Sequence, residues 1–197
     1  MKKFDGYALF LNSYQYRVDC KICPKLTTTG EFTHRNQHGI IRLKEGVADT
    51  ETLLHEVIHA ILHSHGYAYY CFGGFFEEVV CDKLSTELNQ CFHFQKGNSL
   101  DYRDGEISLY EIVEDSLRGT ICNDAFDNYI NDKNREIKKD AGEPLTSEPK
   151  ITNMGEVLTE LLTGRIVEDL SINFLIRRRK DAETLWKQKL ERKSKKK

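Results

Sequence analysis

The chain has 197 residues, of which 39% are hydrophobic and 30% are charged, a balance typical of a globular protein rather than a disordered one. Its apolar runs are only a few residues long, whereas a transmembrane helix needs about 20, so we expect no membrane partner. The N-terminal residues include Asp5 and no long apolar segment, which argues against an export signal and favours a cytoplasmic location.

The first 48 residues favour β-strands. Three segments, Tyr7–Leu11, Tyr14–Val18 and Gly39–Leu43, carry aromatic and β-branched residues and are separated by Gly, Asn and Thr turns. Cys20 and Cys23 form a CxxC pair, but a zinc ribbon needs a second pair at suitable spacing, and the sequence has none. We therefore expect two half-buried, reduced thiols beside a turn.

Helical periodicity begins near residue 50. It predicts one helix from about Thr50 to Ser64, with Gly66 at a C-cap position, and a second from about Phe75 to Cys91. Residues 95–105 then predict a loop and a domain boundary. Beyond this loop, Ser108-Leu-Tyr-Glu111 is a capping-box pattern that opens a helix of about 20 residues.

The C-terminal half is expected to be all-α. Residues 141–150 contain two prolines and predict a linker. From Asn153 to about Arg192 the sequence again has helical character, with an interruption near Gly164 or Asn173.

The division of the chain follows from these elements and from its charge. We predict an α+β fold, with a small sheet and two helices in residues 1–97 and an all-α region in residues 98–197. The last 21 residues, 177–197, hold eleven Lys or Arg and three acids, so this basic tail carries +8 and the remaining residues carry −10. Such a tail is typical either of a solvated end or of a contact with nucleic acid.

His55-Glu-Val-Ile-His59 is an HExxH motif on the first predicted helix. Positions i and i+4 lie one above the other on a helix face, so the two imidazoles can share one metal ion. Glu56 is rotated by about 100° from His55, which places its carboxylate beside the metal, where it can deprotonate a metal-bound water as in metalloproteases. The opposite face of this helix carries an apolar stripe: Leu53, Leu54, Val57, Ile58, Ile61 and Leu62.

A zinc site of this kind needs a third protein ligand, and Glu77 and Glu78 on the next predicted helix can provide it. Glu78 has Asp82 four residues later, where a carboxylate can accept the far N–H of a ligand histidine. Glu77 is instead in phase with Val80 and Leu84, which directs it towards the core. These observations conflict. We prefer Glu78 as the ligand and keep Glu77 as the alternative, the remaining glutamate being a first-turn acid favoured by the helix dipole.

These residues resemble a known family. The run Thr52-Leu-Leu-His-Glu-Val-Ile-His-Ala60 and the later run Glu78-Val-Val-Cys-Asp-Lys-Leu-Ser-Thr-Glu-Leu88 resemble the zinc metallopeptidases of the ImmA/IrrE type, most of all the short versions encoded by phages and mobile elements. In that family a helix with a ligand Glu follows HExxH and carries a polar residue four places on. Aligned on Glu78, the polar residue is Asp82, and the small positions hold Cys81 and Ser85.

The resemblance covers about residues 14–92 and implies a minimal gluzincin-like core, with a short sheet, an HExxH helix and a ligand helix. It also implies that Gly39–Leu43, the strand before the HExxH helix, is an edge that can pair with an extended peptide. The chain departs from the family where Asn89-Gln-Cys-Phe-His-Phe94 replaces an apolar, proline-terminated segment. No helix-turn-helix pattern accompanies the motif, and the C-terminal hundred residues match no family pattern.

Two further groups of residues are candidates for function. Peptide hydrolysis needs a donor to the oxyanion, and His63 and Tyr67 are candidates, neither favoured over the other ring side chains near them. No base-reading motif accompanies the basic tail. The tail begins with four cations that are candidates for phosphate contact: Arg177, Arg178, Arg179 and Lys180.

The sequence therefore predicts a zinc-dependent metallopeptidase that acts on a protein or peptide. One zinc per chain is held by His55, His59 and Glu78, and Glu56 activates a zinc-bound water. One alternative is a catalytically silent, zinc-stabilised interaction or regulatory protein that acts through its helical C-terminal half. Another is a SprT-like protease associated with nucleic acid, although the chain lacks the third His typical of that family.

Overall fold

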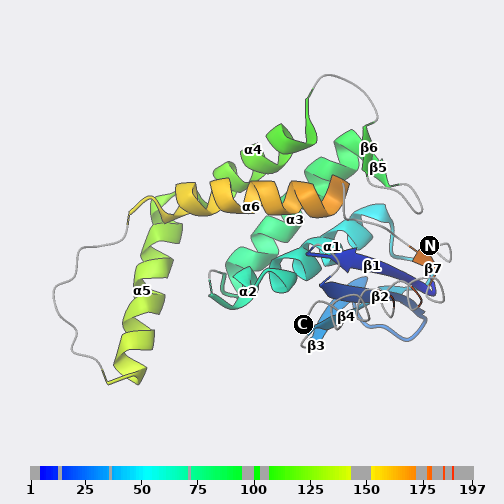
Figure 1. The fold of residues 1–197 in the computed structure, drawn as a ribbon, viewed down its shortest axis with the longest axis horizontal. Coiled ribbons are helices and arrows are strands. Elements are labelled where there is room, and N and C mark those ends of the chain that lie inside the picture. The colour runs from blue at the N-terminus through cyan, green and yellow to red at the C-terminus, as the bar shows by residue number, and fades with distance from the viewer. Residues whose placement is uncertain are drawn as a thin grey trace.

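The computed structural model of the chain has an α+β fold, in agreement with the class predicted from the sequence. A mixed sheet lies at one end of the molecule, the helices extend away from it, and helix α5 (Asp124–Asp140) lies at the opposite end (Figure 1). The residues that the structure describes are 5–12, 15–35, 37–70, 72–94, 100–102, 107–142, 152–171, 177–178, 184 and 188.

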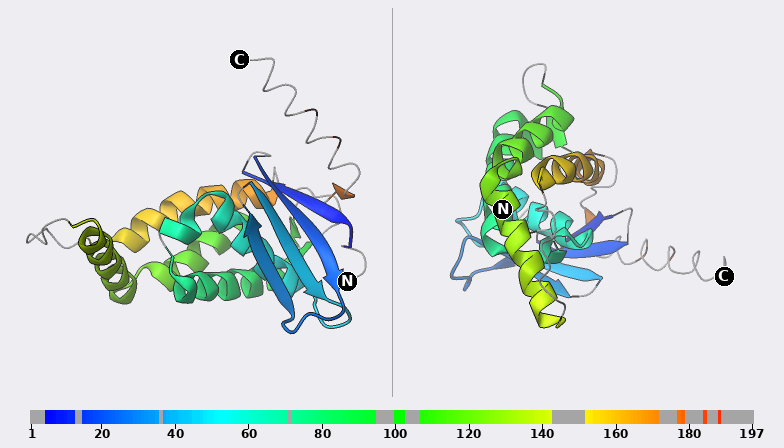
Figure 2. Two further views of the ribbon diagram at one scale, coloured as in Figure 1. Left: turned by 90° about the horizontal axis from the view of Figure 1, so that it is seen from below. Right: turned by 90° about the vertical axis from the view of Figure 1, so that its left-hand side faces the viewer.

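The sheet has the strand order β3-β4-β2-β1-β7 in the described part of the chain. Strands β2 and β4 pair in parallel, and each of the other neighbouring pairs is antiparallel. Figure 2 shows the strands side by side at the end of the helical layer. Their bounds are Tyr7–Leu11 for β1, Tyr16–Cys23 for β2, Gly30–Arg35 for β3, His38–Lys44 for β4 and Arg177–Arg178 for β7.

The position of β3 corrects one expectation. The segment Gly39–Leu43 lies within β4, which pairs with β2 on one side and β3 on the other, so it is not an edge. The edge belongs to β3, which the sequence analysis does not predict. Every residue of β3 is half-buried or exposed. The strand therefore lacks the alternation of apolar and polar side chains that indicates a strand in a sequence.

The CxxC pair lies on β2, where Cys20 is buried and Cys23 is half-buried, and both are free thiols. Half-burial was therefore the wrong expectation for Cys20. Side chains alternate between the two faces of a strand, so residues three positions apart point to opposite faces. The two sulfurs cannot share a metal ion in this conformation.

Helix α1 (Thr50–Ser64) lies between the sheet and helix α3 (Gly74–Cys91). The Asp49 carboxylate caps α1 by accepting the backbone N–H of Thr52 at 2.9 Å. The chain leaves α1 through Gly66, whose φ of +82° is a left-handed conformation that glycine adopts readily. The bounds of α1 are those predicted, and a short helix, α2 (Tyr67–Tyr70), connects it towards α3.

The single helix expected after Ser108 is two helices. Helix α4 (Leu109–Ile121) ends at Cys122, and Asn123 starts α5 by accepting the backbone N–H of Phe126 at 2.9 Å. The capping box of Ser108 and Glu111 is present as predicted. The break follows from Asn123, because Asn is among the preferred N-cap residues.

Helix α6 (Met154–Ser171) crosses the molecule beside α4 (Figure 1). It continues through Gly164 without the interruption considered there, and Asn173 lies outside the described residues. Near its start, a Cβ atom at Gly155 would lie only 2.0 Å from the carbonyl oxygen of Ile121. Glycine therefore permits α6 to touch the end of α4.

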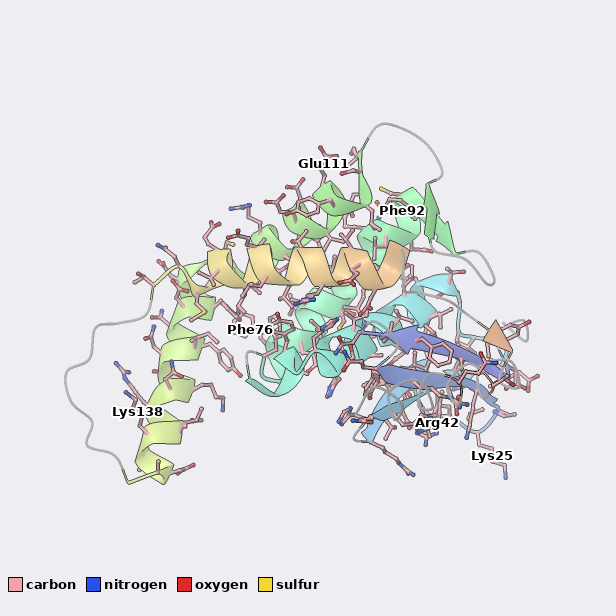
Figure 3. The ribbon with its side chains drawn as sticks, in the orientation of Figure 1. Lys25, Arg42, Phe76, Phe92, Glu111 and Lys138 are labelled. Carbon is pink, nitrogen blue, oxygen red and sulfur yellow. The ribbon has the colours of Figure 1, made fainter. Side chains whose placement is uncertain are left out.

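The helices beyond residue 97 share one hydrophobic core with the first half of the chain. Leu117 of α4 and Ile166 of α6 belong to the same buried cluster as Val57 of α1. Figure 3 shows Phe76 of α3 directed towards α5, where its ring lies 5.0 Å from that of Phe126. A small second sheet, β5 (Phe92–Phe94) with β6 (Leu100–Tyr102), follows α3. The prediction that residues 98–197 are all-α is therefore wrong at two short strands, β6 and β7, which form through pairing with β5 and β1.

A buried carboxylate on α6 also joins this helix to the first half of the chain. The Asp169 carboxylate of α6 accepts the backbone N–H of Asn12 at 2.8 Å and lies 2.9 Å from Nε2 of His65. It therefore joins α6 to the ends of β1 and α1. Among the described residues, no helix has the length and apolar character needed to cross a membrane.

Candidate metal centre

Polar side chains face one another across α1 and α3 at regular intervals, and we call this set the polar ladder. The two helices are antiparallel, so four residues forward along α1 correspond to four residues back along α3. Steps of four residues keep side chains on one helix face. The opposed pairs are Glu51 with Thr86, His55 with Asp82, and His59 with Glu78.

Three side chains of the polar ladder bring their donor atoms together. The Nε2 atoms of His55 and His59 lie 3.1 Å apart, and the Glu78 carboxylate lies 3.4 Å from each of them. Ligand atoms about 2.1 Å from a tetrahedral ion are separated by about 3.4 Å. Glu78 makes these contacts through a different oxygen for each imidazole, Oε2 for His55 and Oε1 for His59. The spacings are close to those around a tetrahedral ion, and His55, His59 and Glu78 form a group that could hold a metal ion.

Glu77 lies against the other side of the His59 ring. Its Oε1 atom is 2.6 Å from Nδ1 of His59 and 3.2 Å from Nε2 of His63. Because the two nitrogens of an imidazole point in different directions, a carboxylate at Nδ1 lies away from the donor group at Nε2. Glu77 accepts the Nδ1 proton and leaves the Nε2 lone pair available. It is thus a partner of a candidate ligand, rather than an ordinary first-turn acid.

Asp82 stands in the same relation to the other histidine, with Oδ1 3.0 Å from Nδ1 of His55. Each candidate ligand histidine therefore has its own carboxylate, an arrangement that fixes ring orientation and raises ligand basicity. The two carboxylates differ in exposure, since 74% of the Asp82 side chain is exposed but only 11% of that of Glu77. Solvent screens Asp82 more, so Glu77 is the stronger partner.

The pKa values of this cluster follow from its burial and charges. Burial would raise the pKa of Glu77, but hydrogen bonds and charges from His59 and His63 lower it to about 2. Burial would lower the pKa of His59, but its interactions with Glu77 raise it above the ordinary value. Burial and the neighbouring His59 lower the pKa of His55. Glu77 is therefore ionised at neutral pH and makes His59 the more basic of the two imidazoles.

Glu56 is buried, with 6% of its surface exposed, at the point where α1 approaches β3. A Cβ atom at Gly30 would lie 2.6 Å from its Oε1 atom, so glycine allows the strand to pass this close. Burial raises the pKa of Glu56 to about 7, although positive charge on His59 opposes the shift. A carboxyl group with such a pKa can accept and release a proton near neutral pH.

A cleft of about 770 Å³ opens between β3, α1 and α3, and the donor group and Glu56 line it. His63 also lines the cleft, and its ring lies 5.3 Å from that of Phe32 and 5.2 Å from that of His34. Tyr67 lies outside this cleft on α2, with its ring 6.3 Å from that of His65. Of the two candidate oxyanion donors, His63 is the one positioned at the cleft.

Sequence reasoning missed three features of this centre: the role of Glu77, the close approach at Gly30, and the cleft wall formed by β3. The first had a signal. A glutamate in phase with apolar residues such as Val80 must find a buried partner, and His59 and His63 lie at suitable spacing on α1. The other two had none, because they depend on which strand reaches α1.

Two of the four candidate phosphate-binding cations lie in the described part of the chain, at the edge of the sheet opposite β3. Arg177 and Arg178 form β7, which pairs with Tyr7 and Ala8 of β1. Arg179 and Lys180 lie outside the described residues.

Comparisons with protein families, curated proteins and solved structures found no match to this chain. The function is therefore inferred from the geometry of the centre.

Proposed function

We propose that the protein is a zinc-dependent peptidase whose reaction takes place in the cleft between β3, α1 and α3. The observation that carries the proposal is the triangle of donor atoms from His55, His59 and Glu78, with the buried Glu56 carboxylate in the same cleft. Two imidazoles and one carboxylate are a ligand set typical of catalytic zinc. When bound, zinc would polarise a peptide carbonyl and lower the pKa of a water molecule.

Glu56 is the proposed general base and acid. Its carboxylate takes a proton from the attacking water and later delivers that proton to the leaving amine. Its pKa of about 7 favours both transfers at neutral pH. Glu77 and Asp82 hold the rings of His59 and His55 in place, so the donor atoms do not have to reorganise when a metal ion binds.

The free edge of β3 supports a peptide as the substrate. Among the described strands β3 has β4 as its one neighbour, so the backbone groups on its other edge can pair with an extended chain, apart from the Phe32 N–H, which donates to Glu56. Gly30 and Phe32 of this strand both line the cleft. A peptide added at this edge would pass beside Glu56, which contacts the strand at Gly30.

Metal content tests the proposed ligands. Purified protein, supplied with zinc and then freed of excess metal, should retain about one zinc per chain by elemental analysis. Glu78→Ala should lose this zinc, whereas Glu77→Ala should retain it with weaker affinity. Zinc-free wild-type protein, or zinc lost only in Glu77→Ala, would contradict the ligand set.

Hydrolysis of a degenerate peptide library, followed by mass spectrometry, tests the proposed chemistry. Zinc-loaded wild type should release new N-termini, and zinc-loaded Glu56→Gln should be slower by about 10² or more. Full activity in Glu56→Gln would overturn the mechanism. Stoichiometric zinc with no cleavage by the wild type would instead favour a catalytically silent, zinc-stabilised protein.

A further inference from the structure

The cleft is strongly acidic, and its acidic residues extend beyond the donor group to the start of α1. In the part of the chain that the structure describes, no Lys or Arg lines it, and seven carboxylates do: Glu31, Asp49, Glu51, Glu56, Glu77, Glu78 and Asp82. A bound divalent ion would offset only two of these charges. Walls of one sign focus the electric field and concentrate ligands of the opposite sign.

Most of these carboxylates already have partners of opposite charge or defined roles. Glu77, Glu78 and Asp82 contact the ligand histidines, and Glu31 pairs with Arg42 of β4, which is labelled in Figure 3. Glu56 is the proposed base. The remaining two carboxylates lie at the start of α1.

Glu51 is the better placed of these two. Its carboxylate oxygens accept a hydrogen bond from Thr86 Oγ1 at 2.7 Å and from Asn89 Nδ2 at 3.3 Å. Both donors are neutral, so they hold the carboxylate in position and leave its charge intact. Within the described residues, no Lys, Arg or His forms an ion pair with Glu51. Asp49, by comparison, is occupied in capping α1.

The position of Glu51 relates it to the proposed reaction. Glu51 lies one helical step of four residues before His55, a distance of about 6 Å along the axis of α1. Side chains two residues apart on an extended peptide lie on the same face, separated by about 6.6 Å. A peptide with its reacting carbonyl at the donor group would therefore place a side chain one or two residues away beside Glu51.

This end of the cleft is polar as well as acidic. The cleft lining also includes Thr28, Thr29, Thr52 and Ser85. Thr52 follows Glu51 in α1 and Ser85 precedes its partner Thr86 in α3, whereas the ring of Phe32 lies against His63, two turns beyond His55. Hydroxyl groups and a fixed carboxylate suit a side chain with a cationic end, and they offer little to an apolar one.

We propose that the cleft selects peptides with a Lys or Arg one or two residues from the scissile bond, and that Glu51 is the specificity-determining residue. This inference rests on the proposed peptidase function, but it can be tested by binding alone. The probe is a fluorescein-labelled alternating Ala-Lys decapeptide, compared with the Ala-Gln and Ala-Glu decapeptides. Binding to full-length, zinc-loaded Glu56→Gln protein is measured by fluorescence anisotropy, because this variant should cleave the probe about 10² times more slowly than wild type or slower still.

The Ala-Lys peptide should bind at least about tenfold more tightly than the Ala-Gln peptide, and the Ala-Glu peptide should bind most weakly. Adding Glu51→Gln should remove most of this preference. Adding Glu87→Gln instead, which removes an equal charge from the outer surface of α3 where Glu87 pairs with Lys83, should leave it unchanged. Glu51→Lys should reverse the preference towards the Ala-Glu peptide.

Equal binding of the three peptides, or a Lys preference that survives Glu51→Gln, would overturn the inference. Loss of the preference in Glu87→Gln to the same extent would also overturn it, because the effect would then reflect net charge alone. Zinc content of each variant confirms that its centre is folded. A Glu51-dependent Lys preference without cleavage by the wild type would support the binding site while contradicting the proposed peptidase function.

Discussion

Two pairs of packed helices in this protein bury different kinds of polar group. Helices α1 and α3 bury three ionisable side chains and one hydroxyl, that of Ser85, whereas α4 and α6 bury mainly hydroxyl groups, at Ser116, Thr159 and Thr163. Thr163 donates to the carbonyl of Thr159 in its own helix at 2.7 Å, so it needs no partner elsewhere. The Glu77 carboxylate instead has its partner on the facing helix, where its Oε1 atom lies 2.6 Å from Nδ1 of His59.

The two kinds of buried group differ in how much stability depends on a partner in another helix. Removing the partner of a buried ionisable group lowers the free energy of unfolding by several kcal/mol, by order of magnitude, whereas a hydroxyl bonded within its own helix has no such partner to lose. The first pair of helices thus holds the candidate metal centre, whereas the second pair holds mainly apolar and hydroxyl side chains. Asp169 of α6 is the exception, and it pairs with His65 beyond the end of α1 rather than with α4.

The largest expected effect comes from core truncations, one in each pair. Leu84→Ala in α3 and Leu117→Ala in α4 both remove fully buried side chains and should each lower the free energy of unfolding by about 2–5 kcal/mol. Urea denaturation measures this. Only Leu84→Ala should also weaken zinc binding, because it loosens the helix that carries Glu78. An equal loss of zinc affinity in Leu117→Ala would show that α4 and α6 support the candidate zinc site as much as α1 and α3 do.

Next in size is the effect of Glu56 on the stability of the metal-free protein. Its pKa rises from an ordinary 4.5 to about 7 on folding, so the folded protein holds this proton more tightly. The resulting stability is fully present below pH 4.5 and is lost as the pH rises through 7. Glu56→Gln should therefore be more stable than wild type by about 2 kcal/mol above neutral pH and equal to it in acid.

The measurement is thermal or urea unfolding in chelator across that pH range. Glu160→Gln, an exposed glutamate of α6, is the matched control and should give a difference within about 0.5 kcal/mol at every pH. If the difference in unfolding free energy between Glu56→Gln and wild type did not change with pH, the raised pKa of Glu56 would be contradicted.

A smaller effect should follow from removing the charge of Glu77. Glu77→Gln should weaken zinc binding about 10–100-fold, measured by competition with a chromophoric chelator, because His59 loses its carboxylate partner. Asp82→Asn should cost less, since most of the Asp82 side chain is exposed to solvent. A larger loss in Asp82→Asn would reverse the assigned order of the two carboxylates.

The smallest effects concern the helix caps, where the two pairs of helices should behave alike. Asp49→Ala at α1 and Ser108→Ala at α4 should each cost about 1 kcal/mol in unfolding free energy. Hydrogen bonds from the backbone at Thr52 lower the pKa of Asp49 from 3.8. Its contribution is therefore present above pH 3.8 and is lost as the pH falls through the lowered value. A pH-independent cost for Asp49→Ala would contradict this assignment.

Local signals predicted the helices of the centre well. The bounds of α1 were predicted from its helical periodicity and Gly66, and the cap at Asp49 is a further local signal that the prediction did not use. The HExxH pair is equally local, because helical spacing alone puts His55 next to His59, and their rings lie 4.8 Å apart. These features need no knowledge of distant contacts.

Features that depend on distant contacts could not be predicted in the same way. One residue on a helix is a rotation of about 100°, so choosing between Glu77 and Glu78 requires the direction from which α1 approaches. Strand β3 has no apolar alternation, and its role depends on pairing with β4. The break at Asn123 was local but was outweighed by the strong helix signal that begins at Ser108.

The polar ladder has a second consequence, for how the two helices find their alignment. If α3 slid by one turn of four residues, Asp82 would face Glu51 and Glu78 would face His55, leaving His59 opposite Gly74, which has no side chain to offer. Two carboxylates would then oppose each other, and one buried imidazole would lose its acceptor, so the shifted packing is disfavoured. The residues proposed to bind zinc therefore also favour the observed register of the two helices, with or without a bound metal ion.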